Sequence, residues 1–196
     1  MKKNKFKLLY FGCFLILSFF GRCTANKKAG EPKFNIQTKE LTKQEGSDYF
    51  VGFFAESTSV LELQIGHAFI GIGRGIPLTC DLNGEETEMF GFYPKIHIEG
   101  GKSFWAGPVD GKIKNDIRTN INKYVFKKIS FSDFVKVQLK MREWEIKKYE
   151  VTRIDCISFF QDVAKIFEDI TIPDRTQYVT PEEYVSQFIL INRQLK

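Results

Sequence analysis

The stretch IGHAFIGIG, residues 65–73, carries the pattern that decides the fold. Its small and β-branched residues are typical of a buried β-strand, and a histidine stands near its start. Outward from it, three further stretches have the composition of strands: the aromatic run 49–55, residues 86–93, which Pro94 ends, and residues 124–129. These four stretches predict a sheet in the first two thirds of the chain.

Residues 99–111 lie between the last two of these strands and contain four Gly and one Pro. Glycine favours turns through its free backbone, and proline interrupts regular structure because it lacks an N–H group. We therefore expect a loop here, and its position allows it to flank a cleft.

The pattern becomes helical after the fourth strand. Ser130 or Ser132 can cap a helix that runs to about Tyr149. Four large apolar residues fall on one face of it, as expected for a helix packed on a core: Phe134, Val137, Met141 and Trp144. Residues 156–170 have a wider apolar face, which predicts a second, deeply buried helix.

A third helix is predicted to start at Thr180. Thr180 is a suitable cap, Pro181 fits the first helical position, and Glu183 completes a capping box. Strands followed by helices in this order predict an α+β domain, in which an antiparallel sheet packs on helices gathered toward the C-terminal half.

Residues 1–25 have the features of an export signal. Four lysines precede the apolar stretch 8–21, which is too short to span a bilayer comfortably. A cut after Ala25 fits the small-x-small rule. Lipidation at Cys23 is an alternative, although Arg22 is a poor residue before a lipidated cysteine, and an uncleaved anchor helix is another. All three place the rest of the chain in the periplasm or cell envelope, with membrane contact only through this segment or a lipid anchor.

The charge balance changes when the signal is removed. The chain holds 29 Lys and Arg against 24 Asp and Glu, and residues 1–25 contain five of the basic residues and no acidic one. The remainder is neutral, so it lacks the electrostatic footprint of a nucleic-acid binder. Residues 26–46 are polar and without a clear period, which indicates a linker, and residues 47–196 suit a single domain.

Two cysteines follow the signal, Cys80 and Cys156. Asp155 can cap a helix and would put Cys156 in its first turn, where free amides and the helix dipole favour a thiolate. A thiolate is the nucleophile that acyl transfer needs. Alternatively, Cys156 is an ordinary core residue, or it forms a disulfide with Cys80 in an oxidising compartment. Neither cysteine has a second Cys or His at zinc-ligand spacing, so no metal is expected.

Of the two histidines, His67 lies in the predicted strand between small residues, where a substrate has room beside the ring. His97 stands in a less constrained alternating stretch. We therefore expect the pair Cys156 and His67, although His67 as a purely structural histidine remains open.

Three short motifs, GHAFIG at 66–71, FGFYP at 90–94 and DCISF at 155–159, resemble the permuted branch of the NlpC-type papain-like cysteine hydrolase superfamily. This branch includes the lecithin retinol acyltransferase-like proteins, and its histidine strand precedes its cysteine helix, as His67 precedes Cys156. The resemblance covers roughly residues 48–190. It implies a circularly permuted papain-like fold and a thiol hydrolase or acyltransferase that acts on amide or ester bonds without a cofactor.

The resemblance also implies residue roles. Cys156 would be the nucleophile and His67 the base. A polar residue on the strand after the histidine strand would orient the ring, which makes Glu86 or Glu88 the candidate, with Glu88 favoured. The hydroxyl of Tyr149 could lie near the oxyanion.

The function expected from these features is hydrolysis of an amide bond, with a cell-wall peptide as the substrate. Ile157 and Ser158 replace the small residues expected after the cysteine, and they could narrow the cleft. Two alternatives remain open: a non-catalytic envelope binding module with the same fold, and a lipid or acyl-ester hydrolase. The second histidine of the acyltransferase pattern is missing, which weakens the interpretation of the chain as a lipid acyltransferase.

Overall fold

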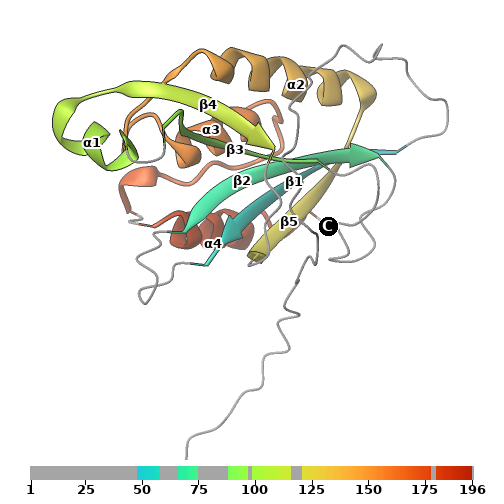
Figure 1. Cartoon of the computed structure of the whole chain (residues 1–196). Coiled ribbons are helices and arrows are strands. Elements are labelled where there is room, and N and C mark those ends of the chain that lie inside the picture. The colour runs from blue at the N-terminus through green and yellow to red at the C-terminus, as the bar shows by residue number, and fades with distance from the viewer. Residues whose placement is uncertain are drawn as a thin grey trace, which may run out of the picture.

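The computed structural model describes residues 48–57, 66–74, 88–96, 99–115, 121–177 and 180–195. Within them, six strands form one antiparallel sheet in the order β5-β1-β2-β3-β4-β6, accompanied by four α-helices (Figure 1). The elements are β1 (Tyr49–Glu56), β2 (His67–Arg74), β3 (Glu88–Pro94), α1 (Glu99–Ala106), β4 (Val109–Asn115), β5 (Ile121–Ile129), α2 (Phe131–Glu145), β6 (Lys148–Tyr149), α3 (Cys156–Ala164), a 3-10 turn (Arg175–Gln177) and α4 (Pro181–Ile191). The predicted α+β class is confirmed. None of these helices is long and apolar enough to cross a membrane.

The predicted export signal (residues 1–25), with Cys23, and the predicted linker (26–46) lie outside the described residues. The same holds for Cys80, Glu86 and His97.

The cap signals read from the sequence are present in the structure. The Ser130 hydroxyl accepts a hydrogen bond from the Asp133 amide and begins α2. The Thr180 hydroxyl accepts from the Glu183 amide, and the Glu183 carboxylate accepts from the Thr180 amide, so the capping box of α4 is complete. Each pair satisfies amides that no helical carbonyl can reach.

Three predicted boundaries were wrong. Residues 99–111 are not a loop, because α1 and the first part of β4 occupy them. The helix predicted over 156–170 ends at Ala164, where Ile166 and Phe167 donate to carbonyls three residues back and continue the chain as turns. The helix predicted to reach Tyr149 ends at Glu145, and Tyr149 instead belongs to β6, which pairs with β4.

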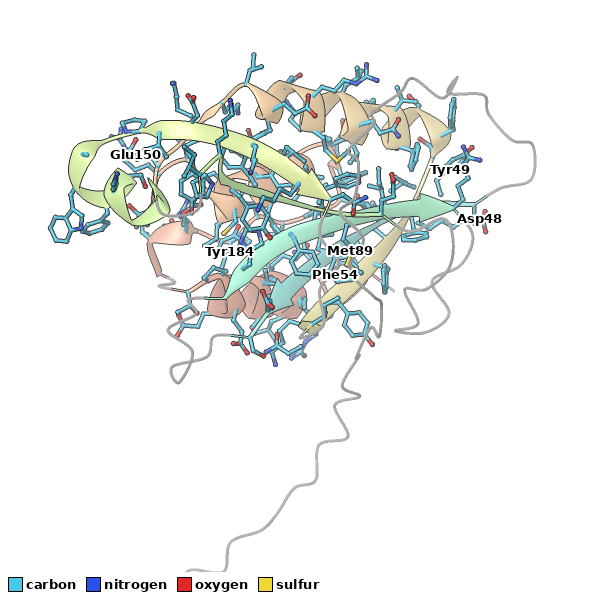
Figure 2. The ribbon with its side chains drawn as sticks, in the orientation of Figure 1. Asp48, Tyr49, Phe54, Met89, Glu150 and Tyr184 are labelled. Carbon is cyan, nitrogen blue, oxygen red and sulfur yellow. The ribbon has the colours of Figure 1, made fainter. Side chains whose placement is uncertain are left out.

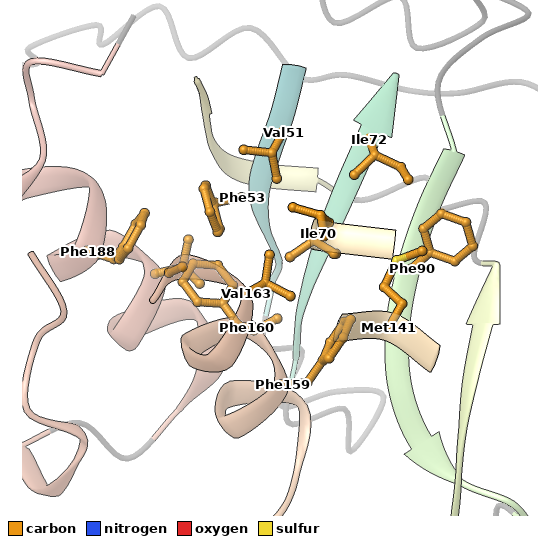
Figure 3. Packing of buried hydrophobic residues seen from close by; sticks show 14 of the residues in the cluster. Val51, Phe53, Ile70, Ile72, Phe90, Met141, Phe159, Phe160, Val163 and Phe188 are labelled. Carbon is orange, nitrogen blue, oxygen red and sulfur yellow. The ribbon is translucent and has the colours of Figure 1, made fainter. Parts of the chain in front are cut away.

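The main core lies between one face of the sheet and the helices α2, α3 and α4. From β1, it takes every second residue beginning at Tyr49. Phe53 lies at its centre, with ring centroids 5.0 Å from those of both Phe160 in α3 and Phe188 in α4 (Figure 3). Trp144 of α2 packs against Phe92 of β3 with a centroid distance of 4.8 Å. Alternation along each strand therefore defines a helix-facing side of the sheet.

The opposite side of the sheet carries a second, smaller apolar cluster. Its buried members are Phe54, Phe69, Met89 and Ile121. The rings of Phe54 and Phe69 stack at 5.2 Å, and Phe54 and Met89 lie in the same region of Figure 2. We call this side of the sheet the second face. Along each strand, residues that point to the second face alternate with residues that point into the main core.

Candidate active site

Cys156 is the first residue of α3, and Asp155 caps the helix as the sequence predicts. One oxygen of the Asp155 carboxylate accepts hydrogen bonds from the amides of Ile157 at 3.0 Å and Ser158 at 3.2 Å. These bonds occupy two of the amides that a helix start leaves without partners. The dipole of α3 points its positive end toward the residues at this cap.

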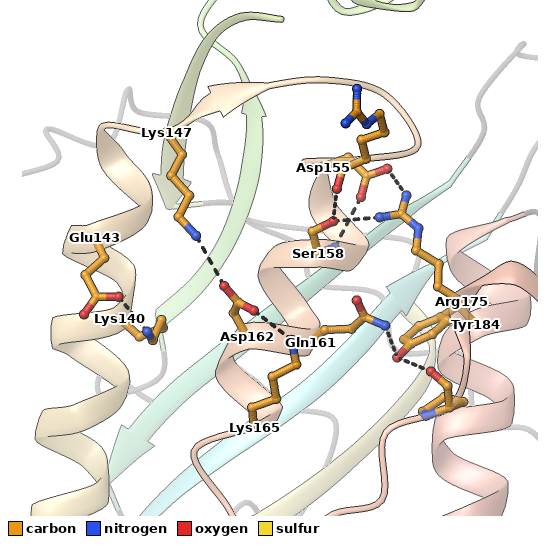
Figure 4. A network of polar contacts seen from close by, with 12 residues as sticks. Lys140, Glu143, Lys147, Asp155, Ser158, Gln161, Asp162, Lys165, Arg175 and Tyr184 are labelled. Carbon is orange, nitrogen blue, oxygen red and sulfur yellow. Dashed lines mark hydrogen bonds and ion pairs between the residues drawn. The ribbon is translucent and has the colours of Figure 1, made fainter.

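The other Asp155 oxygen binds groups from outside the helix. It accepts the amide of Thr152 at 3.0 Å and pairs with the guanidinium of Arg175, which follows α3 in the chain (Figure 4). Arg175 also donates to the Ser158 hydroxyl at 2.7 Å, and that hydroxyl donates to the Arg153 carbonyl at 2.8 Å. The helix start is thus fixed by a closed network, which sequence reasoning missed because Arg175 lies 20 residues away.

Thr152 has a backbone φ of 71°, in the left-handed region that β-branched residues avoid. It lies in the turn between β6 and α3. Its amide donates to Asp155, so the same carboxylate that caps α3 also holds this turn. A strained backbone conformation of this kind persists only where several surrounding contacts hold it in place.

The Cys156 thiol is buried, with 6% of the residue exposed, and it is not bonded to another sulfur. The structure therefore does not support a disulfide at this residue. Burial raises the pKa of the thiol to about 12, and the Asp155 carboxylate adds to that rise. Hydrogen bonds from the amides of Ala68 and Ile157 lower the pKa, and so does the Arg175 charge. Burial has the larger effect. The thiol is neutral at physiological pH.

The structure brings Tyr149 next to Cys156. Tyr149 is half-buried and packs on Phe92 with a ring centroid distance of 5.6 Å. Burial raises the pKa of Tyr149, and the charges of Cys156 and Asp155 raise it further, so the two side chains are close enough to interact electrostatically. The predicted neighbourhood of Tyr149 and Cys156 is present, although Tyr149 stands on a strand rather than in a helix.

The His67 ring packs against β3. It stacks on Tyr93 of β3 at a centroid distance of 4.2 Å, and it lies 6.3 Å from the ring of Phe69, a member of the second face. A Cβ built on Gly91 would lie 2.5 Å from the His67 Nε2 atom, so the imidazole covers the β3 backbone on that face.

The neighbour of His67 in the chain, Ala68, points the other way into the main core, where Cys156 lies. Alternation along β2 turns the His67 side chain to the second face, since Ala68, Ile70 and Ile72 pack against the helices. The Cys156 sulfur accepts the Ala68 amide and therefore lies beside the β2 backbone next to His67. The Cys156–His67 pair stays a prediction.

The register of the sheet places Glu88 away from His67. It is exposed at the start of β3 and pairs with Ile72, five residues along β2 from His67. Instead, Glu56 of β1 stands directly opposite His67 in the ladder and is 8% exposed, like His67 itself. Directly opposed residues of an antiparallel pair share one face. Glu56 and Tyr93 are thus two polar neighbours of the imidazole among the described residues. Their positions follow from strand register, which the sequence motif did not contain.

No group of three or more His, Cys, Asp or Glu residues able to hold a metal ion occurs among the described residues. The chemistry available around Cys156 is a neutral thiol, two backbone amides, a phenol and one carboxylate–guanidinium pair.

No protein-family model matches the chain, and no curated protein matches it. Among solved structures, the chain is similar to the type VI secretion system effector TseH, with a TM-score of 0.45 and 14% sequence identity. The superposition covers 75% of this chain and 90% of that chain.

Proposed function

We propose that this chain is a non-catalytic binding protein of the cell envelope, on a permuted papain-like scaffold of the NlpC type. The resemblance of three motifs to that superfamily supports the scaffold, and the predicted export signal supports the location. The observation that carries the proposal is the burial of both Cys156 and His67, which are 6% and 8% exposed, with the imidazole stacked on Tyr93 of β3.

A general base must lie within hydrogen-bond reach of the thiol that it activates. In this structure the imidazole stacks on Tyr93 and lies over the β3 backbone at Gly91. A substrate carbonyl must also reach the sulfur, and Cys156 is only 6% exposed. Both features favour a structural role for the two residues.

The state of the thiol supports the same conclusion. With its pKa raised to about 12, the Cys156 thiol stays protonated at pH 7. A cysteine nucleophile needs a thiol pKa that is lowered toward neutral pH. An adjacent imidazolium commonly provides that lowering. In this fold, Cys156 acts as a core residue at a well-capped helix start.

Digestion of purified peptidoglycan tests the proposal. We expect the full chain to release no new amine termini above the level of Cys156→Ala, and Cys156 to react with iodoacetamide far more slowly than free cysteine at neutral pH. His67→Ala should leave that slow reaction unchanged. Release of amine termini by the wild type that Cys156→Ala abolishes would sink the proposal.

The second candidate is a thiol hydrolase that cleaves an amide bond in a cell-wall peptide. Its favouring observation is the position of Cys156 in the first turn of α3, with two amides on the sulfur and the Tyr149 side chain beside it. This arrangement would suit an oxyanion site. The same digestion decides between the candidates, and turnover of short acyl esters without peptide release would instead indicate an ester hydrolase.

A further inference from the structure

Helix α1 carries two aromatic side chains that are turned to solvent. Trp105 is 86% exposed and Phe104 is 58% exposed, and their rings meet edge to face with centroids 5.0 Å apart. Ile96, in the turn that precedes α1, is 53% exposed. Tryptophan is usually largely buried, so a tryptophan this exposed beside a phenylalanine forms a distinct apolar surface.

The opposite side of α1 is fixed to the body of the protein. Ser103 is buried, and its hydroxyl donates to the Gly100 carbonyl at 2.7 Å and accepts from the Val151 amide at 3.2 Å. A Cβ on Gly100 would lie 3.1 Å from Pro94, so the helix start packs tightly on the end of β3. The aromatic side chains are therefore held outward by a rigid attachment.

Three lysines lie on α1 or on the segments next to it, β4 and the end of β3. Lys102 is exposed on α1, and Lys95 adjoins Ile96, with its amide donating to the Asp110 carbonyl of β4 at 2.7 Å. Burial lowers the pKa of Lys112, and the charges of Lys114 and Lys95 lower it further, so these ammonium groups lie near one another. The nearby carboxylate of Asp110 is paired with Lys148 at 2.5 Å.

We propose that this aromatic–basic surface, formed by Ile96, Phe104 and Trp105 with Lys95, Lys102 and Lys112, docks the protein onto an anionic phospholipid membrane. The position of α1 at one end of the molecule, beside β4, leaves the helix free to meet a flat surface (Figure 1).

The chemistry of the surface favours a bilayer over other anionic partners. Tryptophan and phenylalanine rings prefer the headgroup level, where an apolar body and polar surroundings meet. Lysines beside them can reach lipid phosphates, and each such contact strengthens binding to an anionic leaflet. A soluble anion would engage the lysines but leave the two rings in water. The inference goes beyond the proposed function, because it holds whether or not Cys156 reacts.

Fluorescence of the full chain tests the inference at Trp105 itself. The chain has two tryptophans, so Trp144→Phe leaves Trp105 as the only one. With vesicles of phosphatidylcholine and phosphatidylglycerol, we expect its emission to shift to the blue and to be quenched by lipids with brominated chains. Vesicles of phosphatidylcholine alone should give little change, and high salt should reverse the shift.

Cosedimentation with the same vesicles gives a second readout that does not depend on the Trp144 substitution. We expect Trp105→Ala to weaken binding at least tenfold and Lys102→Gln to weaken it about fivefold. Leu190→Ala removes an apolar side chain that is 46% exposed on α4, and this control is expected to bind like the wild type.

Because residues 1–25 could bind vesicles by themselves, sedimentation of the full chain alone does not support the inference. Binding that Trp105→Ala leaves unchanged, with no quenching of Trp105, overturns it. Equal binding to both vesicle types also overturns it. A blue shift on purified peptidoglycan without quenching by brominated lipids would overturn it in favour of a cell-wall ligand.

Discussion

The protonation of Cys156 links the stability of the fold to pH. Burial raises the pKa of the folded thiol to about 12 from its usual 9.0, so the unfolded chain loses the proton first as pH rises. The stabilising effect is complete below pH 9.0 and is lost as pH rises toward 12. Urea titrations across this window should show the advantage of wild type over Cys156→Ala shrinking by up to about 1.4 kcal/mol per pH unit. A constant difference would contradict the buried, neutral thiol.

Individual residues differ in how far the sequence could place them. Asp155 and Cys156 were predictable, because a cap and the first helical turn are local patterns. The direction of His67 was not, since it depends on which face of β2 the helices cover, and that is set by contacts with residues about 90 positions later in the chain. Glu56 was missed for the same reason: only the register of β1 against β2 brings it opposite His67.

At the scale of elements, β2 and β3 fit together through Gly91, over which the His67 and Tyr93 rings lie. A Cβ there would come within 2.5 Å of the His67 Nε2 atom and 2.7 Å of the Tyr93 ring. We expect Gly91→Ala to destabilise the fold by about 1–3 kcal/mol, as overpacking does. The cost should be smaller in a His67→Ala background, because one obstructing ring is gone.

Urea denaturation of the four proteins in this double-mutant cycle measures the coupling. Additive effects of the two substitutions would mean that the imidazole does not cover Gly91, and they would reopen the question of which way His67 points. Gly107→Ala would not serve as a control for this cycle. Gly107 has a φ of 87°, and an alanine at that φ would strain the backbone by itself.

The elements themselves were largely predictable where a periodic pattern or a cap was present. The strand stretches 49–55 and 65–73 and the starts of α2 and α4 agree with the structure to within two residues. Residues 99–111 were not predictable, because their glycines suggest a loop. There, the buried Ser103 hydroxyl and the packing on Pro94 stabilise α1, and pairing with β3 stabilises β4.

At the scale of the whole molecule, the main core couples three helices to the sheet, which predicts a single cooperative unfolding transition. Trp144 reports on that core, with ring centroids 4.8 Å from Phe92 and 5.5 Å from Phe159. In a Trp105→Phe variant, fluorescence follows Trp144 alone. We expect its urea midpoint to coincide with that of far-ultraviolet circular dichroism. Separate midpoints would show that α2 unfolds independently of the sheet.

The packing of Phe53 against Phe188 also bears on when this chain acquires its shape during synthesis. Phe53 lies in the first described strand and Phe188 in the last described helix, so β1 cannot complete its contacts until Phe188 has left the ribosome. Contacts this distant along a chain form slowly. A nascent chain of this design stays open for longer than one built from neighbouring pairs, and if the predicted export signal acts, that delay leaves the chain unfolded while it is threaded through a translocation channel.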